Sequence, residues 1–571
     1  MAGTTVQKRT HARPAATYPR KRATKACHTC RFRRTKCDNA RPSCSSCVRL
    51  GADCLYAQAD PSTFDPASLA ILQRMDELEA LIRSKEADML PVIETSPSEP
   101  QTDLCSDPNM PRKHSLIHIE AVLKWPVFEE KEFPARHYPG PFAEDEHALS
   151  ESANLPISVN VDLPCAESLL QSYFDNVHIF NPILEEEAVR EYMKMVCFNG
   201  VGWDAMSCLL LLIYAHGSIA TPFSNHLDGS SPTTFHHSPA IRQAETYFLA
   251  AQKRMGMLLC GSRVIDAQCF FLAGAYLVAT LRPVEGWRMF VQALACCQGF
   301  LINHPDRTGT EGEWSPKQRI YWTCFKSELE LRLELNLPQK SDWDLTYPTF
   351  FPTPPNELRT KDEAAWYYYL AEIALRRLGN RILSHLYQSD MASTHESSIE
   401  YAVADFEEQM DSWLRSLPEM LALDIPDLQD TEHEALRFIL SGHFLDCQEM
   451  MYWYFVENAV HYGRIPSATA ETYVRKGLRV CVERIQQNRK GFYYRHHGTW
   501  LMLRSCARSA FVLLAALRRP ELASMLPGDW EESIIDVARM LEFWKDECRD
   551  VQEKYEILDA LFGVWRGPVY P

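Results

Sequence analysis

The spacing of apolar residues separates a long C-terminal region from the rest of the chain. From about Cys165 onward, apolar residues recur every three or four positions, as in AESLLQSYFDNV, AETYFLAAQKRMGMLL and SIIDVARMLEFWKDE. This spacing places apolar side chains on one face of an α-helix. Few strand signals interrupt the pattern, so it predicts a large all-helical domain over residues 161–571.

Three segments inside this region need separate interpretation. The most apolar stretches, Cys208–Tyr214 and Ala267–Leu281, are shorter than the roughly 20 residues that a membrane-spanning helix needs. We expect both to be buried helices, and we expect no membrane partner. Glu328–Leu337 alternates with a period of two, which is typical of a strand. We nevertheless predict a helix there, because the segment lacks β-branched residues and consists almost wholly of Leu, Glu and Arg.

A further helix is predicted ahead of this domain, over residues 69–89. The segment contains no Gly or Pro and is rich in strong helix formers. About three heptads place apolar residues, interrupted by one lysine, at alternating d and a positions: Ile71, Met75, Leu78, Ile82, Lys85 and Met89. The pattern predicts a short coiled-coil helix that forms a homodimer. An amphipathic helix packed on its own chain is the alternative.

The remaining N-terminal segments are polar. Residues 1–26 form a basic arm that we expect to be disordered, and residues 55–68 form a connector. Residues 90–160 begin with a Pro- and Ser-rich stretch that cannot form a compact core, so we expect a flexible linker. The predicted fold class is therefore mainly α, with a small cysteine-rich module over residues 27–54.

Charge is distributed unevenly over these parts. The chain of 571 residues carries a net charge of −16, but residues 1–56 hold 13 Lys and Arg against two acidic residues. A basic N-terminal part is therefore joined to an acidic body. Only the basic part has the electrostatic character needed to displace counterions from a phosphate backbone, and we expect it to bind double-stranded DNA.

Six of the 19 cysteines follow a regular spacing, C-x2-C-x6-C-x6-C-x2-C-x6-C, which repeats one half-motif. Each half-motif offers three thiolates, but a tetrahedral zinc site needs four ligands. The two halves can therefore complete two zinc sites only if they share ligands. Pseudo-symmetry nominates Cys27 and Cys44 as the shared pair. The spacing predicts two Zn2+ ions per chain, bound by Cys27, Cys30, Cys37, Cys44, Cys47 and Cys54. A disulfide scaffold is the alternative, which the absence of an apolar leader at the N-terminus disfavours.

This module resembles the fungal Zn(II)2Cys6 binuclear cluster transcription factors at all six cysteines. As in that family, Asp38 follows the third cysteine and Pro42 lies in the loop between the halves. The resemblance implies that the first helix enters the major groove and reads a CGG-like triplet. Arg34 occupies the position of the base-reading lysine. The candidate DNA-binding residues are Arg31, Arg33, Arg34 and Lys36, of which all but Arg34 are equally suited to binding phosphates.

The helical region resembles the all-helical regulatory domain of the same family. Glu167–Leu184 is similar to the opening of that domain, where a helix with a Tyr-Phe pair leads to Val-His and Pro-Ile. A second similarity places Trp322 and Phe325 at the aromatic positions of the family. Glu328 stands where aspartate is more usual, and Leu337 stands where arginine is common.

The helical region contains no motif that indicates catalysis. Walker, G-x-S-x-G and H-E-x-x-H motifs are absent from the sequence, so we do not expect an enzyme. We interpret the adjacent His496 and His497 as ordinary histidines and the 13 other cysteines as buried thiols. Aromatic runs at residues 366–369 and 452–455 are typical of a helical core, with pocket lining as the alternative. Residues 529–565 favour a packed final helix over an exposed activation segment.

These observations together predict a nuclear, zinc-dependent, sequence-specific DNA-binding regulator of RNA polymerase II transcription. The expected partners are double-stranded DNA, a second copy of the chain, and the transcription machinery or coregulators. The basic residues Arg20, Lys21, Arg22 and Lys25 are a candidate nuclear localisation signal. The alternative is a ligand-sensing helical protein or a recruitment scaffold in which the zinc module is accessory.

Overall fold

The computed structural model divides the chain into two compact units, Met1–Ser106 and Asp107–Pro571. It describes residues 27, 29–30, 33, 35–38, 40, 43–54, 117–128, 162–223, 238–302, 311–337, 352, 360–388, 396–423 and 432–566. Helices and no strand occur in this part of the chain. The predicted basic arm, connector and coiled-coil helix lie outside the described residues.

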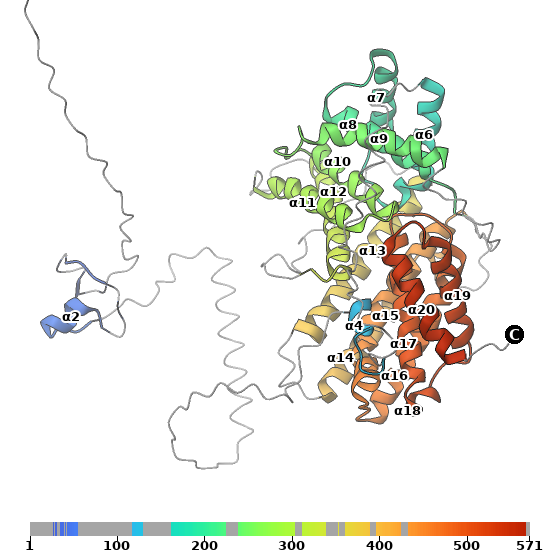
Figure 1. The fold of residues 1–571 in the computed structure, drawn as a ribbon. Coiled ribbons are helices and arrows are strands. Elements are labelled where there is room, and N and C mark those ends of the chain that lie inside the picture. The colour runs from blue at the N-terminus through green and yellow to red at the C-terminus, as the bar shows by residue number, and fades with distance from the viewer. Residues whose placement is uncertain are drawn as a thin grey trace, which may run out of the picture. The chain divides into compact units, whose positions relative to one another are not determined.

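In the described part of the second unit, helices are the regular elements (Figure 1). Its first half contains α4 (Ile119–Val122), α6 (Leu163–Asn176), η4 (His178–Phe180), α7 (Glu186–Asn199), α8 (Ala205–Ile219), α9 (Pro239–Met255), α10 (Val264–Ala279), α11 (Pro283–Ile302) and α12 (Glu311–Glu334). Its second half contains α13 (Thr360–Leu383), η6 (Ser384–Gln388), α14 (Glu396–Arg415), η8 (Glu419–Leu421), α15 (Glu434–Tyr462), α16 (Ala468–Asn488), η9 (Arg489–Gly491), α17 (Thr499–Leu517), α18 (Pro520–Ala523), α19 (Trp530–Trp544) and α20 (Arg549–Arg566).

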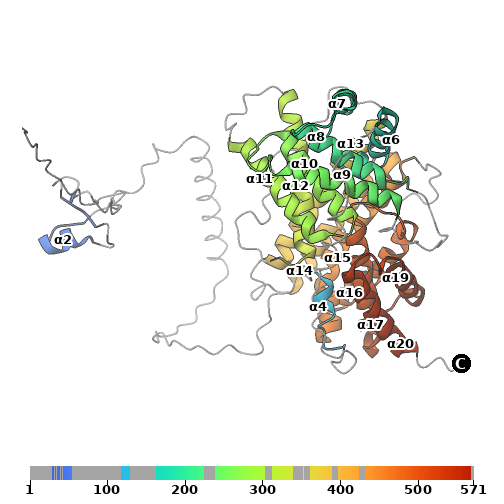
Figure 2. The same ribbon diagram turned by 45° about the horizontal axis from the view of Figure 1, so that its top comes forward.

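Neighbouring helices in this unit pack mainly as sequential pairs, which are α8 with α9, α10 with α11, and α15 with α16. Figures 1 and 2 show α6–α12 gathered at one end of the unit and α15–α20 at the other. Helix α13 packs against α15, and α17 contacts α10, so both ends share one hydrophobic core. The all-helical prediction for this region is confirmed.

Side-chain caps fix where several of these helices begin. Asp162, Asp204, Ser238 and Ser467 each accept a hydrogen bond from the backbone N–H three residues later, at the starts of α6, α8, α9 and α16. Such caps satisfy N–H groups that have no partner inside the helix. At the other end, α15 stops at Gly463, whose φ of 66° belongs to the left-handed region that glycine adopts readily.

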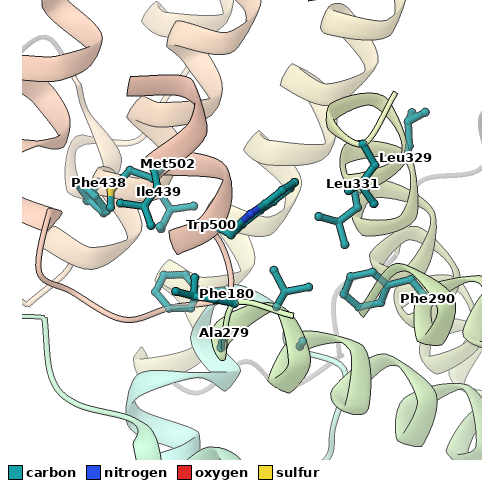
Figure 3. Packing of buried hydrophobic residues seen from close by; sticks show 14 of the residues in the cluster. Phe180, Ala279, Phe290, Leu329, Leu331, Phe438, Ile439, Trp500 and Met502 are labelled. Atoms are coloured by element: carbon teal, nitrogen blue, oxygen red, sulfur yellow. The ribbon is translucent and has the colours of Figure 1, made fainter. Parts of the chain in front are cut away.

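The core is formed where these helices cross, and Figure 3 shows part of it around Trp500, Phe180 and Phe290. As predicted, the two most apolar stretches form buried helices, α8 and α10. Helix α17 is long and apolar enough to cross a membrane, but 89% of its apolar window is buried inside the unit. Its apolar character is therefore explained by its place in the core.

The alternating segment is helical as predicted, since α12 continues through Glu334. The aromatic runs are mostly core: Trp366, Tyr369 and Trp453 are each at most 3% exposed, whereas Tyr367 is 42% exposed. Residues 529–565 form α19 and α20, which pack against each other and against α17. The packed-helix interpretation of the C-terminal region is thus confirmed.

Two predictions need correction. Residues 117–128 fall within the predicted linker of residues 90–160, yet Ile119, Val122 and Trp125 are at most 2% exposed, and α4 packs on α17. Burying these apolar side chains stabilises the folded chain more than burying the side chains of a polar linker would. The expectation of buried thiols is wrong for Cys260, which is exposed, and for Cys165, Cys197 and Cys548, which are half-buried.

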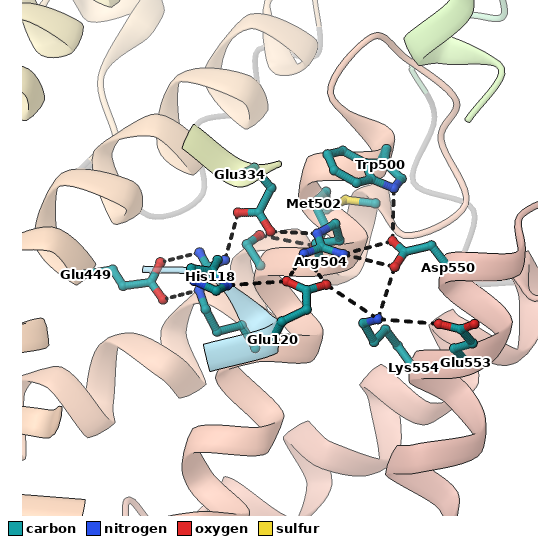
Figure 4. Close-up of polar contacts among 12 residues, drawn as sticks. His118, Glu120, Glu334, Glu449, Trp500, Met502, Arg504, Asp550, Glu553 and Lys554 are labelled. Carbon is teal, nitrogen blue, oxygen red and sulfur yellow. Dashed lines mark hydrogen bonds and ion pairs between the residues drawn. The ribbon is translucent and has the colours of Figure 1, made fainter. Parts of the chain in front are cut away.

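Buried ion pairs join helices from both halves of this unit (Figure 4). Arg504 of α17 is 1% exposed and donates to Glu120 of α4, Glu334 of α12 and Asp550 of α20, at 2.6–3.0 Å. Lys554 of α20 adds a contact of 3.1 Å to the same Asp550. A buried charge is tolerated only when it is paired and hydrogen-bonded, so this network specifies how four helices meet.

Candidate metal centre and nucleic-acid interface

The cysteine-rich module contains two local structures of the same form. In the first half, the backbone N–H of Cys30 donates to Sγ of Cys27 at 3.4 Å. In the second half, the backbone N–H of Cys47 donates to Sγ of Cys44, also at 3.4 Å, and opens α2 (Ser45–Leu50). The repeat in the sequence is therefore a repeat in the structure, because each C-x2-C turn aims its second N–H at its first sulfur.

The two halves bring their sulfur atoms together. Sγ of Cys27 lies 3.7 Å from that of Cys44 and 3.6 Å from that of Cys47, and the sulfurs of Cys30 and Cys44 are 3.6 Å apart. A zinc ion bound to four thiolates at about 2.3 Å spaces the sulfurs about 3.8 Å apart. The three distances are close to that spacing, and the four sulfurs all lie within 4.8 Å of one another, as the inner ligands of a zinc–thiolate cluster do.

Cys44 also belongs to a second group. Its sulfur, that of Cys37 and a carboxylate oxygen of Asp38 lie within 4.8 Å of one another. The sixth cysteine, Cys54, accepts a hydrogen bond from the backbone N–H of Cys44 at 3.2 Å. Cys27 and Cys44 are fully buried, whereas Cys54 is half-buried. These positions support the predicted sharing of inner cysteines, although the assignment of individual ligands stays a prediction.

Hydrogen bonding makes Cys44 a good metal ligand. The backbone N–H of Cys47 lowers the pKa of the Cys44 thiol, because the hydrogen bond stabilises the thiolate form. Burial and the neighbouring sulfur of Cys44 raise the pKa of Cys47 to about 12. Binding a divalent cation therefore requires the release of protons from this cluster, and zinc affinity falls as the pH falls.

Two polar contacts, which the sequence did not reveal, join the halves beside the sulfurs. Asp38 accepts hydrogen bonds from the backbone N–H of Ser45, at 3.1 Å, and from its hydroxyl. The hydroxyl of Thr29 donates to the backbone carbonyl of Asp53 at 2.6 Å. The contact with Ser45 lowers the pKa of Asp38. In the sequence, Asp38 directly follows Cys37 and Ser45 directly follows Cys44. Their separation of seven positions does not by itself indicate that the two side chains are in contact.

The predicted DNA-binding residues are described only in part. Arg33 and Lys36 are exposed, and the backbone N–H of Arg33 donates to the carbonyl of Thr29, which extends the first helical turn. Arg31 and Arg34 lie outside the described residues. The second half carries Arg49, also exposed, in the last turn of α2. Positive side chains thus face solvent around the sulfur cluster.

The buried histidines of the helical unit are not part of this centre. His496 and His497 lie in the second unit, where burial lowers the pKa of each, for His497 to about 3. Both are therefore neutral at physiological pH. These observations fit the interpretation of the pair as ordinary histidines.

A clustered set of six cysteines, ringed by positive charge and joined to an all-helical unit, defines the class of zinc-cluster regulators of transcription. Two family models match the chain: the fungal Zn(2)-Cys(6) binuclear cluster domain over residues 25–62, and the fungal specific transcription factor domain over residues 170–422. The chain belongs to the fungal Zn(II)2Cys6 transcription factors. Members of this family bind two zinc ions and DNA, and they are transcription factors rather than enzymes.

Similar proteins carry corresponding names. The chain is 25% identical over 417 residues to the putative transcription factor ecdB of Aspergillus rugulosus, covering 70% of this chain and 71% of that protein. It is 22% identical over 469 residues to an uncharacterized transcriptional regulatory protein of Schizosaccharomyces pombe, covering 72% of this chain but 57% of that protein. Transcription factor FBD3 of Fusarium pseudograminearum is 51% identical over 47 residues, 8% of this chain and 6% of that protein.

Proposed function

We propose that this protein regulates RNA polymerase II transcription in the nucleus by reading CGG-like triplets as a homodimer. The observation that carries the proposal is the convergence of four cysteine sulfurs within 4.8 Å of one another, with three sulfur–sulfur distances of 3.6–3.7 Å that are typical of zinc–thiolate ligands. A rigid module of about 28 residues cannot be stabilised by burial alone, so zinc must supply its folding free energy.

In this proposal six cysteines hold two zinc ions, and Cys27 and Cys44 bridge them. Two features support the bridging assignment. These two sulfurs are fully buried and lie 3.7 Å apart, and each accepts a backbone hydrogen bond from the second cysteine of its own C-x2-C pair. Bridging sulfurs must lie between both ions and therefore deepest in the module.

Base reading is proposed for Arg34, four residues after Cys30 in the sequence. An arginine side chain presents two N–H groups that match O6 and N7 of guanine in the major groove. Arg31, Arg33 and Lys36 would hold the phosphate backbone on either side, and the exposure of Arg33 and Lys36 supports that role. The heptads of residues 69–89 would pair two modules, and residues 55–68 would set the half-site spacing.

Selection of bound sequences from random duplex DNA by the zinc-loaded full-length protein tests the proposal. We expect enrichment of paired CGG-like triplets at a fixed spacing. Arg34→Ala should lose the triplet preference, whereas the matched control Arg49→Ala, in the second half-motif, should only weaken binding to all sequences.

Two results would contradict this function. Enrichment of no triplet by the unmodified protein would exclude sequence reading. An unchanged preference in Arg34→Ala would favour a recruitment scaffold that depends on other regulators for its position on DNA. Single triplets with no preferred spacing would contradict the homodimer alone.

A further inference from the structure

A cavity of about 140 Å³ lies inside the helical unit, among α12, α13, α15, α16 and α17. Part of its wall is apolar and is formed by Leu333, Phe438, Ile439, Leu501 and Met502. Ile117, at the start of the buried segment 117–128, also lines it. Its volume is similar to that of an engineered protein cavity that holds benzene. The space therefore fits a molecule of about six to nine non-hydrogen atoms.

The charged part of the wall is already internally paired. Glu334 and Glu449 accept hydrogen bonds from Arg508, and Asp446 accepts from Arg484 at 2.7 Å. Glu330 pairs with Arg376 at 2.7 Å. Four carboxylates thus face three guanidinium groups across the cavity, for a formal charge of −1. A full negative charge would be repelled, and a cation would meet carboxylates that arginines already neutralise.

Glu330, His443 and Asp446 place ligand atoms within 4.8 Å of one another, which raises the question of a metal ion. Guanidinium groups stand 2.7 Å from both carboxylates, on Arg376 and Arg484. Their positive charge opposes a metal cation at the same oxygens. The cavity is therefore better suited to an uncharged molecule.

Apart from Nε of Arg376, which lies 3.6 Å from a carboxylate oxygen of Glu372, two N–H donors on residues that line the cavity have no acceptor among the residues that the structure describes. Nδ1 of His496 accepts a hydrogen bond from the backbone N–H of Gly498 at 3.0 Å, so the proton of this neutral ring lies on Nε2. Nε2 is buried without a partner in this part of the chain, and so is Nε of Arg484. An unmet buried donor costs about 1–3 kcal/mol, so both favour an incoming oxygen atom.

Gly442 keeps part of the cavity open. It lies in the interior of the 29-residue helix α15, where glycine is less favourable than alanine by about 0.5–1 kcal/mol. A Cβ atom built at this position meets no other atom within 4 Å. Since Gly442 lines the cavity, any larger side chain there would occupy the space itself.

We propose that this cavity is an effector site for a small uncharged molecule that has an apolar body and an oxygen acceptor, such as a ketone, lactone or amide. The oxygen accepts from His496 and Arg484, and the apolar body packs against Phe438 and Leu501. Binding would stabilise Ile117 and the buried segment that follows it. The regulatory consequence rests on the proposed function, but the binding itself does not.

The site is tested with three uncharged probes, benzamide, cyclohexanone and δ-valerolactone, added to the zinc-loaded full-length protein. Toluene lacks the acceptor, benzoate carries a negative charge and benzylamine carries a positive charge. Calorimetric titration and the thermal unfolding midpoint are measured for each. We expect at least one uncharged probe to bind at least tenfold more tightly than toluene, benzoate and benzylamine, and to slow hydrogen exchange in residues 117–128.

Two variants locate the binding. Gly442→Leu should abolish probe binding by filling the cavity, whereas Gly563→Leu, at another helical glycine with open space around its Cβ, should retain it. His496→Leu should reduce the preference for the uncharged probe over toluene about tenfold or more.

The inference is overturned if none of the three uncharged probes binds, if benzoate or benzylamine binds most tightly, or if Gly442→Leu binds the probe as well as Gly563→Leu does. DNA binding is measured on the same samples. Loss of probe binding with intact zinc and triplet recognition would refute the effector site alone, whereas probe binding without triplet recognition would refute the proposed function alone.

Discussion

The guanidinium of Arg508 in α17 donates two hydrogen bonds to the carboxylate of Glu449 in α15, both at 2.8 Å. Both side chains are buried, and Arg484 of α16 donates to the same carboxylate at 2.9 Å. Burial by itself would raise the pKa of Glu449, but Arg508 and Arg484 hold it below its usual value. The pair therefore stays ionised inside the unit and fixes the contact of α15 with α16 and α17.

Replacing Glu449 with Gln should destabilise the helical unit by about 1.5–3 kcal/mol, because it neutralises the carboxylate that two buried guanidinium groups share and leaves each with one carboxylate partner, Glu334 for Arg508 and Asp446 for Arg484. Urea unfolding followed by circular dichroism at 222 nm measures the change. The matched control is Glu471→Gln in α16, whose partner Arg475 lies at 2.8 Å on the exposed surface. An exposed pair of this kind contributes at most about 0.5 kcal/mol. Equal effects of the two substitutions would show that burial does not determine how much the Glu449 ion pair contributes to the free energy of unfolding.

Stability should also fall in acid because of buried neutral histidines. Burial lowers the pKa of His216, which contacts the carbonyl oxygen of Leu272 at 2.9 Å, from 6.5 to about 4. Between these values the unfolded chain takes up a proton and the folded chain does not. The free energy of unfolding therefore decreases as the pH falls from 6.5 to 4, by about 1.4 kcal/mol per pH unit for this group.

His216→Gln removes that titration while keeping a donor for the Leu272 carbonyl. The variant should lose less stability than the unmodified protein between pH 6.5 and pH 4, by up to about 3 kcal/mol. Urea unfolding at a series of pH values measures, for each protein, the slope of the free energy of unfolding against pH. Parallel slopes would mean that His216 does not titrate differently in the folded and unfolded states.

Local patterns explain what the sequence could predict in this fold. The three- and four-residue apolar period predicted the helices, because it depends only on the geometry of one helix. The four-residue helix α4 was missed, although Ile119, Val122, Trp125 and Phe128 follow one another at spacings of three. Polar and Pro-containing flanking residues obscured that short signal.

Long-range contacts explain what the sequence could not predict. Arg504 donates to Glu334, 170 positions away, and to Glu120, 384 positions away. No local pattern joins such residues, because their contact depends on how whole helices pack. The cysteine module is the opposite case, since its ligand spacing is set by two short turns and predicts the sulfur cluster directly. The cavity at Gly442 arises from packing and left no signal in the sequence.

Removal of zinc should unfold the module and abolish DNA binding. Substitution of one cysteine in the module, compared with one outside it, tests which thiols bind the zinc ions. Cys44→Ser should lose both zinc ions, because the sulfur of Cys44 belongs to both groups of neighbouring ligand atoms. Cys260→Ser, at an exposed thiol in the helical unit, should retain two ions per chain. Elemental analysis and duplex DNA binding measure the outcome. Retention of one ion in Cys44→Ser would argue against a bridging sulfur.

Two glycines in helix interiors should respond in opposite ways to alanine. A Cβ at Gly442 meets no atom within 4 Å, so Gly442→Ala should stabilise the unit by about 0.5–1 kcal/mol through its helix propensity. A Cβ at Gly217 of α8 would collide with the backbone carbonyl of Leu169 in α6, which cannot move aside without shifting its helix. Gly217→Ala should therefore destabilise the unit by about 1–3 kcal/mol. Urea unfolding of both variants at pH 7 measures the two changes, and destabilisation by Gly442→Ala would show that the space beside α15 is filled in solution.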